Sequence, residues 1–223
     1  MQTFATAAPI TALVSVPAGN LRFIAADRAD VTVEVRPATP GKSRDVKAAE
    51  EVSVDFADGV LRITAPEGKN QLFGPSGSVQ VTVQLPAGSH VEGKAAGAEL
   101  RGVGRLGTVS FDSAQGPVKL DEADGARLTL ADGDITIGRL TGSAELTTAR
   151  GDLKITEAVT GTLVLSTQAG NVSVGAARGV AATLDAGTTY GRIHNALQNA
   201  EGKGAGLTIR ATTAHGDISA HSH

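Results

Sequence analysis

The chain has 223 residues, a formal net charge of −3, 28 glycines, five phenylalanines, one tyrosine, and neither cysteine nor tryptophan. The absence of cysteine excludes a disulfide framework and a thiolate metal site. No block of Lys or Arg is present, which argues against nucleic acid or an anionic membrane surface as the partner. A core of this composition is built from stacked aliphatic side chains rather than from aromatic anchors.

The N-terminal segment lacks the pattern of a secretion signal. Residues 1–19 contain no Lys or Arg, include Pro9 and Pro17, and alternate as a strand does from Ile10 to Val16. No apolar run reaches the roughly 18 residues needed to span a bilayer. We therefore expect a cytoplasmic protein with no signal peptide, no transmembrane segment and no membrane insertion.

The chain changes character near residue 90, since seven of the eight prolines precede that point and 21 of the 28 glycines follow it. In the first part, Asp58-Gly59 between two alternating runs predicts a hairpin. Residues 43–51 predict a short helix with Ser43 as its N-cap. The expected strands are Leu21–Ala25, Val31–Arg36, Val52–Phe56, Val60–Ala65 and Val79–Leu85, with a turn at residues 17–19.

The second part repeats a glycine followed by an alternating apolar pair. The copies begin at Gly116, Gly133, Gly151, Gly170, Gly191 and Gly216, with a degenerate earlier copy at Gly97. Their spacings of 17, 18, 19, 21 and 25 residues are typical of a solenoid. We expect the coils to stack in the order in which these copies follow one another along the chain.

The alternation on both sides of each glycine predicts strand, sharp corner, strand, with every second side chain turned inward. The Asp or Asn after the glycine is expected to close an Asx-turn on its own backbone. The inward ladders are Val118, Ile135, Leu153, Val172, Ile193 and Ile218, and then Ser113, Leu130, Thr148, Thr167, Thr188 and Thr213. The coils are expected to stack at about 4.8 Å.

The predicted fold is therefore all-β. We expect a right-handed single-stranded parallel β-helix, or β-solenoid, over residues 91–223. Residues 1–90 are expected to form an antiparallel β-strand capping region that packs on the first coil or leads into it, because an open row of backbone groups invites association unless it is covered.

Several segments resemble a known family. Residues 189–197 and 207–218 are similar to the closing segment of actinobacterial β-strand-repeat proteins named "putative adhesins", or toastrack-type domains of unknown function. Residues 4–10, 45–50 and 83–89 extend the resemblance over nearly the whole chain. It implies a single-stranded β-helix and a link to envelope or stress functions, and it leaves the function open.

Two sets of side chains suggest metal binding, but a simpler interpretation is favoured for each. The residues after the corner glycines, Asp134, Asp152, Asn171 and Asp217, could offer oxygen ligands to calcium, yet the dense nonapeptide of calcium β-rolls is missing, and we expect turn formation. His215, His221 and His223 are expected in a frayed tail with adventitious affinity for Zn or Ni. His194 is expected on the outer, solvated face of its strand.

No enzymatic motif is complete. Gly41-Lys42-Ser43 resembles the end of a phosphate-binding loop, but Arg36 occupies the position of its required glycine, and we expect a turn. Residues 74–78 predict a loop and not a nucleophile elbow. The outward positions Lys119, Thr136, Lys154 and Ser173 form no repeated acid cluster. The sequence thus predicts no catalytic, cofactor-binding or metal-binding residues, and no cofactor.

The leading hypothesis is a non-enzymatic scaffold or interaction module whose β-helix offers a rigid lateral surface to a protein partner of unknown identity. The alternative is a self-assembling structural protein that polymerises end to end through uncapped coils, as bactofilin-type β-helices do. A carbohydrate-active β-helix enzyme is the third possibility, resting on fold analogy alone. The oligomeric state is left open.

Overall fold

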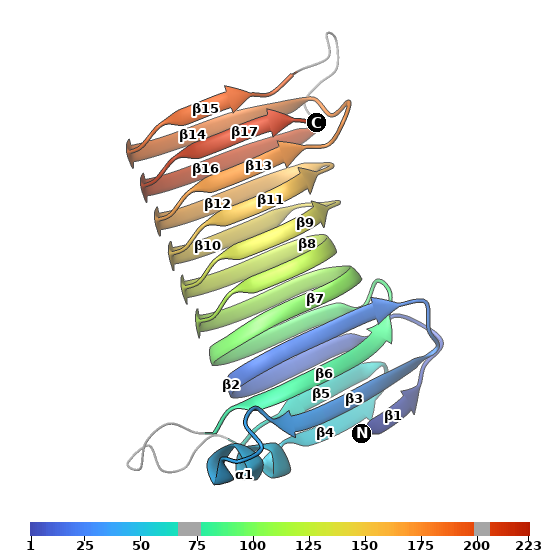
Figure 1. The fold of residues 1–223 in the computed structure, drawn as a ribbon. Helices are drawn as coiled ribbons and strands as arrows, with labels where there is room; N and C mark the ends of the chain where they lie inside the picture. Colours follow the sequence, from blue (N-terminus) through green and yellow to red (C-terminus); the bar gives the residue numbers. More distant parts are fainter. Residues whose placement is uncertain (67–76, 199–205) are drawn as a thin grey trace. The chain divides into compact units, whose positions relative to one another are not determined.

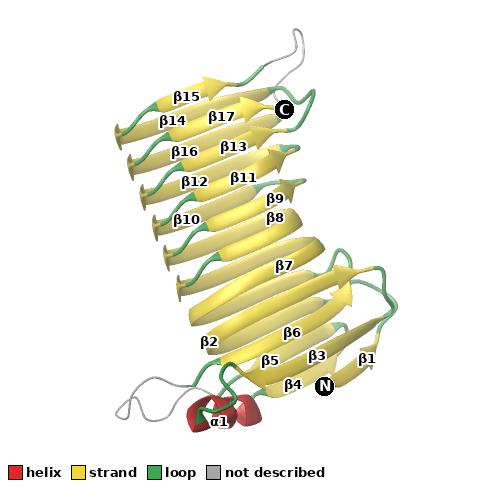
Figure 2. Ribbon diagram, in the orientation of Figure 1, coloured by secondary structure: helices red, strands yellow, loops and turns green. Residues whose placement is uncertain are grey.

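The computed structural model describes residues 1–66, 77–198 and 206–223. The chain divides into two compact units, Met1–Gly116 and Pro117–His223. Both units consist almost entirely of strands, so the predicted all-β class is confirmed (Figures 1 and 2). The predicted boundary between residues 90 and 91 stays a prediction.

The first unit contains seven strands and one helix in its described part. Its elements are β1 (Gln2–Ala5), β2 (Thr11–Ala26), β3 (Asp30–Pro37), α1 (Ser43–Glu51), β4 (Ser53–Ala57), β5 (Val60–Thr64), β6 (Val79–Pro86) and β7 (His90–Gln115). The hairpin at Asp58-Gly59 is confirmed, because β4 and β5 pair antiparallel and both turn residues have positive φ.

Strand β2 runs unbroken through the turn that was predicted at residues 17–19. It pairs parallel with β5, β6 and β7, and the register with β7 extends from Thr11 to Ile24. Among the described strands of this unit, the antiparallel ladders join β1 to β3, β3 to β6 and β4 to β5. The expectation of an antiparallel N-terminal region is therefore wrong for β2. The alternation of inward and outward side chains along this strand is equally compatible with parallel pairing.

Helix α1 forms where the sequence predicts it, but its N-cap is Lys42 and not Ser43, and no side chain caps it. The carboxylate of the buried Asp45 instead accepts the backbone N–H groups of Thr39 (3.1 Å) and Ser78 (3.0 Å). These hydrogen bonds favour the charged form and hold the pKa of Asp45 below its ordinary value. Asp45 thus holds two segments at the start of the helix, the turn that contains Thr39 and the residues around Ser78 before β6.

The second unit contains ten strands in its described part, and all their pairings with one another are parallel. They are β8 (Val118–Asp132), β9 (Ile135–Leu140), β10 (Ala144–Arg150), β11 (Leu153–Ala158), β12 (Gly161–Ala169), β13 (Val172–Ala176), β14 (Ala182–Tyr190), β15 (Ile193–Ala196), β16 (Leu207–His215) and β17 (Ile218–Ser222). Successive pairs such as β10–β11 and β12–β13 form one coil each. The inward ladders predicted from the repeat are in register.

The coils do not stack in chain order. Strands β16 and β17 insert between β12–β13 on one side and β14–β15 on the other (Figure 1). The ladder therefore runs Val172, Ile218, Ile193, with the last copy of the repeat inside and the penultimate copy outermost. The expected sequential order is wrong at this point, and the C-terminal tail is a strand with neighbours on both sides instead of a frayed end.

Two residues disfavour an inner position for the β14–β15 coil. Asn195 occupies the inward ladder position that Ala220 and Val174 hold in the coils beneath it, and its amide would be buried between aliphatic side chains in an inner coil. On the outside it is exposed and accepts the Leu197 N–H (3.1 Å). Arg192 replaces the Asp or Asn of the other corners, so this coil offers no carboxylate to a further layer.

Candidate interaction surface

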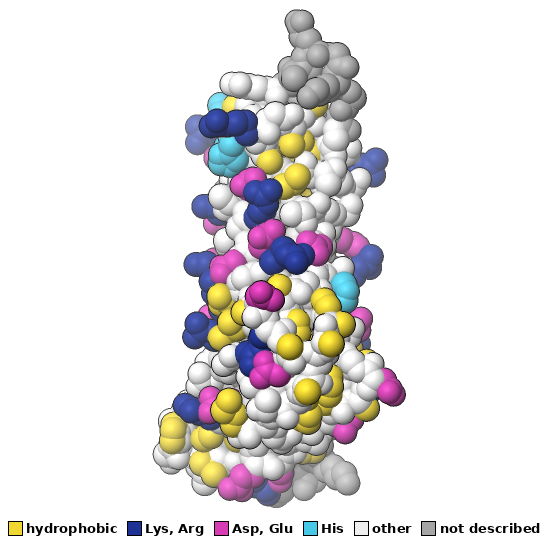
Figure 3. Space-filling view, turned by 90° about the vertical axis from the view of Figure 1, so that its right-hand side faces the viewer, with side chains coloured by type: hydrophobic (Ala, Val, Ile, Leu, Met, Phe, Trp, Pro, Cys, Tyr) yellow, Lys and Arg dark blue, Asp and Glu magenta, His cyan; other side chains and the backbone are white. Residues whose placement is uncertain are grey.

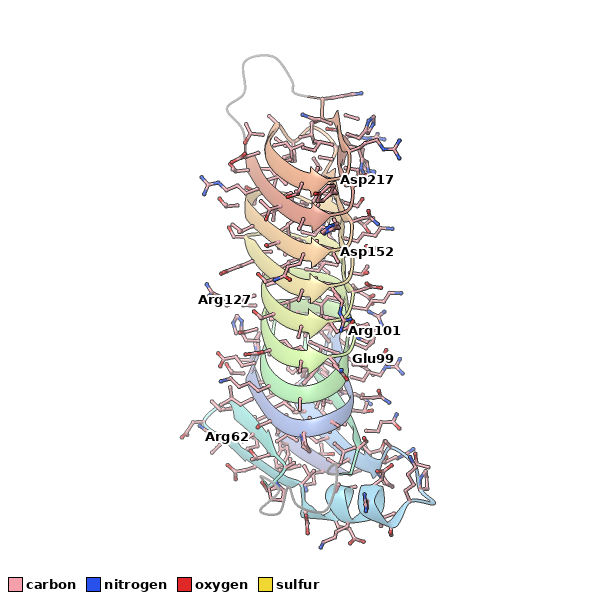
Figure 4. All side chains as sticks on the ribbon, turned by 90° about the vertical axis from the view of Figure 1, so that its left-hand side faces the viewer. Arg62, Glu99, Arg101, Arg127, Asp152 and Asp217 are labelled. Atoms are coloured by element: carbon pink, nitrogen blue, oxygen red, sulfur yellow. The ribbon has the colours of Figure 1, made fainter. Side chains whose placement is uncertain are left out.

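The Asp and Asn side chains at the corners of the second unit link one coil to the next. Oδ1 of Asp134 accepts the backbone N–H of Asp152 (2.8 Å), and Oδ1 of Asp152 accepts that of Asn171 (2.7 Å). The chain of bonds continues from Asp217 N–H to Asn171 Oδ1 (2.9 Å) and from Arg192 N–H to Asp217 Oδ1 (2.8 Å). The expected Asx-turn within one corner is thus replaced by hydrogen bonds between corners, on one side of the unit (Figure 4).

A column of inward threonines supports the same corners from inside. Thr167 Oγ1 donates to the carbonyl of Gly151 (3.1 Å), Thr213 to that of Gly170 (3.0 Å) and Thr188 to that of Gly216 (3.0 Å). These hydroxyls satisfy carbonyl groups that the sharp turn would otherwise leave buried without a donor. The polar ladders therefore hold the corners together.

Among the described residues, no group of three or more His, Cys, Asp and Glu side chains is placed to hold a metal ion. His221 and His223 lie together with ring centroids 5.0 Å apart, and His223 Nε2 is 2.8 Å from the Thr156 carbonyl oxygen. His215 lies on β16, where it stacks on Tyr190 at 5.0 Å. The three histidines thus belong to two separate contacts, and His194 is exposed on β15 as expected.

The outward charges of the second unit form pairs between neighbouring coils. Arg127 contacts Glu145 (3.0 Å), Arg150 contacts Asp132 (2.9 Å), and Arg139 contacts Glu157 (2.7 Å). Basic and acidic side chains are interspersed over the face in Figure 3 and do not gather into a patch of one sign. Such exposed pairs each contribute little to stability, and they offer no concentrated field to a charged ligand.

The Gly41-Lys42-Ser43 segment lies at the start of α1, as part of the turn before the helix and its first residue. The carboxylate of Asp45 occupies this end of the helix, which disfavours an anion there. The 74–78 segment falls mainly outside the described residues, and only its last two residues are within them. Neither segment forms part of a candidate site.

The outermost coil of the second unit differs from all the coils beneath it. Within the described chain, β14 pairs only with β16 and β15 only with β17, so from Thr183 onward the second edge of each strand has no strand partner. Ile193 is 47% exposed, whereas the other members of its inward ladder are at most 1% exposed. Tyr190, the only tyrosine of the chain, is 68% exposed beside it. The edge therefore combines free backbone groups with uncovered apolar and aromatic side chains.

We name this region, β14 and β15 with Tyr190, Arg192 and Ile193, the terminal edge. Sequence analysis did not single it out, because it treated Ile193 as one more inward residue of a regular stack. The lone tyrosine and the change from Asp to Arg at position 192 are the signals that could have marked it. Aromatic residues and arginine are the types that most often carry binding energy in protein interfaces.

Fold and surface together define an all-β repeat protein with an exposed terminal edge. A family model for Toastrack DUF4097 matches residues 13–222. The chain belongs to this family of unknown function.

Solved structures of similar fold come from several bacteria. A protein from Bacteroides fragilis named a "putative adhesin" is 13% identical, with a TM-score of 0.58 over 98% of this chain and 95% of that one. A protein from Parabacteroides distasonis named a "putative lipid binding protein" is 13% identical, with a TM-score of 0.48 over 98% and 95% of the two chains. At this identity the first of these supports the fold alone.

No curated protein matches the chain. Within its described residues, the structure has no helix of the length and apolarity needed to cross a bilayer.

Proposed function

We propose that this protein is a non-enzymatic protein-interaction module that binds its partner through the terminal edge. The observation that carries the proposal is the combination, on one outer coil, of an open sheet edge with the exposed Tyr190 and Ile193. An extended chain added to such an edge gains backbone hydrogen bonds and covers the apolar side chains at the same time.

The family and the adhesin-named neighbour point in the same direction, toward a domain that binds rather than catalyses. Regular columns of hydrogen bonds hold each coil to the next, as the Thr167 and Asp152 contacts do, and favour a rigid support for the edge. A surface that needs no rearrangement loses little entropy on binding. Use of the lateral face by a second partner stays a prediction.

We further propose that the parallel coil of the second unit is a right-handed single-stranded β-helix. Parallel strands joined by a crossover in one sheet are right-handed in nearly all proteins, because the twist of the strands favours that hand. A crystal structure of the full chain would decide the hand directly.

A cytoplasmic location also stays a proposal, and fractionation of the native cell with an antibody against the chain would test it. Recovery with the envelope or in the medium would contradict it.

The interaction module is tested by photo-crosslinking in the native cell. A photo-reactive phenylalanine replaces the tyrosine at position 190, and a control variant carries it at position 147, an exposed outward position on β10. The proposal predicts a discrete protein adduct from position 190 and none from position 147. Equal labelling at both positions, or no adduct at position 190, would refute it.

A further inference from the structure

The half-buried Leu184 and Ala186 and the exposed Ile193 define what a partner of the terminal edge must provide. Leu184, Ala186 and Ile193 continue inward ladders whose other members in the second unit are buried aliphatic and alanine side chains. A layer that covers them must bring small aliphatic side chains at the same spacing, together with backbone groups for the open edge. The terminal edge of another copy of this chain presents that set of groups.

The corner hydrogen bonds decide how such a copy can dock. The corners at Asp134, Asp152, Asn171 and Asp217 each accept the N–H of the next layer through the side chain, and this series ends at Arg192, which has no acceptor in its side chain. A copy stacked in parallel on β15 would leave its corner amide without that acceptor. Antiparallel pairing about a two-fold axis does not place corner on corner, so it avoids this loss.

The charges on the edge agree with two-fold docking. The exposed Asp185 lies in the middle of β14, and the side chain of Arg192, 91% exposed, lies just beyond its C-terminal end. Arg192 also lies 3.8 Å from Asp217 of its own chain. The edge therefore carries both signs, and antiparallel pairing of two copies brings no block of like charge together, whereas an edge of one sign would repel its own copy.

From these three features we infer that the terminal edge binds a second copy of the same chain, edge to edge, as a closed two-fold dimer. The inference rests on the proposed function and names its partner. A two-fold contact uses the same surface on both copies, and so it ends assembly at two and gives no filament.

The chain contains no cysteine, which allows a clean cross-linking test. Gly187 lies in β14 with an outward, exposed position, and nothing lies within 4 Å of an added Cβ. Gly187→Cys is expected to form a covalent dimer on mild oxidation at least about tenfold faster than the control Thr147→Cys, because disulfide formation requires the two Cα atoms to approach within about 7 Å.

Sedimentation of the full chain over a wide concentration range gives the second measurement. We expect a monomer–dimer equilibrium, weakened at least about tenfold by Ile193→Lys, because lysine on an edge strand opposes strand pairing. Thr189→Lys serves if Ile193→Lys fails to fold by circular dichroism, and Thr147→Lys is the control that leaves the equilibrium unchanged.

A protein that is monomeric at every concentration, a dimer unaffected by both edge variants, or assemblies that grow without limit would overturn the inference. An adduct between position 190 and a different protein, together with a monomeric chain, would overturn the dimer and leave the interaction module intact. No adduct at position 190 and no dimer would remove both.

Discussion

At the scale of single residues, stability is concentrated where one side chain holds backbone groups that the chain would otherwise bury without partners. Asp45 performs this role in the first unit and the Asp and Thr columns perform it in the second. Apart from the bond between Asp45 and Thr39, these side chains bond to backbone groups distant in sequence. Substitutions at these positions are therefore expected to act on the fold and not on binding.

Asp45→Asn is expected to lower stability and to change its dependence on pH. The pKa of Asp45 is lower in the folded chain than in the unfolded chain, chiefly because of the Ser78 N–H. The unfolded chain therefore takes up the proton first, and the stabilisation is present above the ordinary pKa near 4 and lost as the pH falls through the folded value. Urea unfolding of both proteins between neutral and acidic pH measures this.

The difference in the free energy of unfolding between Asp45→Asn and the parent protein should be largest at neutral pH and should shrink in acid. Asp30, whose pKa is lowered by the Arg28 side chain, remains in both proteins and cancels in the comparison. A difference in the free energy of unfolding that stays constant with pH would show that the charge of the Asp45 carboxylate does not stabilise the fold.

Gly151→Ala tests the close approach of two corners. Gly151 has φ of +138°, and a Cβ there would lie 2.2 Å from the carbonyl oxygen of Gly133. We expect the free energy of unfolding to fall by at least about 2 kcal/mol, since both the backbone conformation and the neighbouring coil oppose the methyl group. The matched control is Gly187→Ala, where nothing lies within 4 Å and no positive φ is required. Equal unfolding midpoints for the two variants would contradict the reasoning.

At the scale of elements, the position of a coil in the stack depends on a few side chains. The β14–β15 and β16–β17 coils share most of their inward residues, such as Ala186 and Ala211 or Thr188 and Thr213. They differ in aliphatic size at Ala182 and Leu207, and in polarity at the corner and at the second inward position of the following strand. The two polar differences disfavour an inner position for the β14–β15 coil, because a buried amide or a missing acceptor costs more than small changes in aliphatic packing.

Ala220→Asn and Asn195→Ala form a matched pair for this argument. Ala220 is 1% exposed, and an asparagine there should cost about 2–4 kcal/mol because its amide would be buried in an aliphatic column. Asn195→Ala removes one exposed local hydrogen bond and should cost less than about 1 kcal/mol. Chemical denaturation of the two variants gives both values, and similar losses would argue against the explanation of coil order.

At the scale of the whole molecule, the second unit is a stack in which each inner coil gains from two neighbours and the outer coil from one. Stability in such an array is nearly a sum of nearest-neighbour terms. The outer coil should therefore open first, even though its residues resemble those of the inner coils.

Amide hydrogen exchange on the Ile193→Lys variant measures this without interference from self-association. Amides of β14 and β15 should exchange well before those of β10–β13, which lie between paired strands on both sides. The parent chain at high concentration should show added protection on β14 and β15 only. Uniform protection across the stack in the variant would indicate a single cooperative unit.

The sequence by itself determined the local and repetitive features of this protein. Alternating apolar residues around Gly133, Gly151 and Gly170 were enough to place strands, corners and inward ladders, because side-chain direction in a strand follows from position alone. The helix over residues 43–51 and the Asp58-Gly59 hairpin were predicted from other local signals, an N-cap residue and a turn pair that favours positive φ.

Only the tertiary structure decided which neighbours those elements have. The pairing of β2 with β5, β6 and β7, the bonds from one corner Asp to the next, and the insertion of β16–β17 beneath β14–β15 all join residues far apart in the chain. A repeat makes its copies nearly interchangeable, so periodicity cannot order them. An inner position would bury the amide of Asn195 and would leave the next corner without a side-chain acceptor at Arg192, and the observed order leaves Tyr190 and Ile193 exposed.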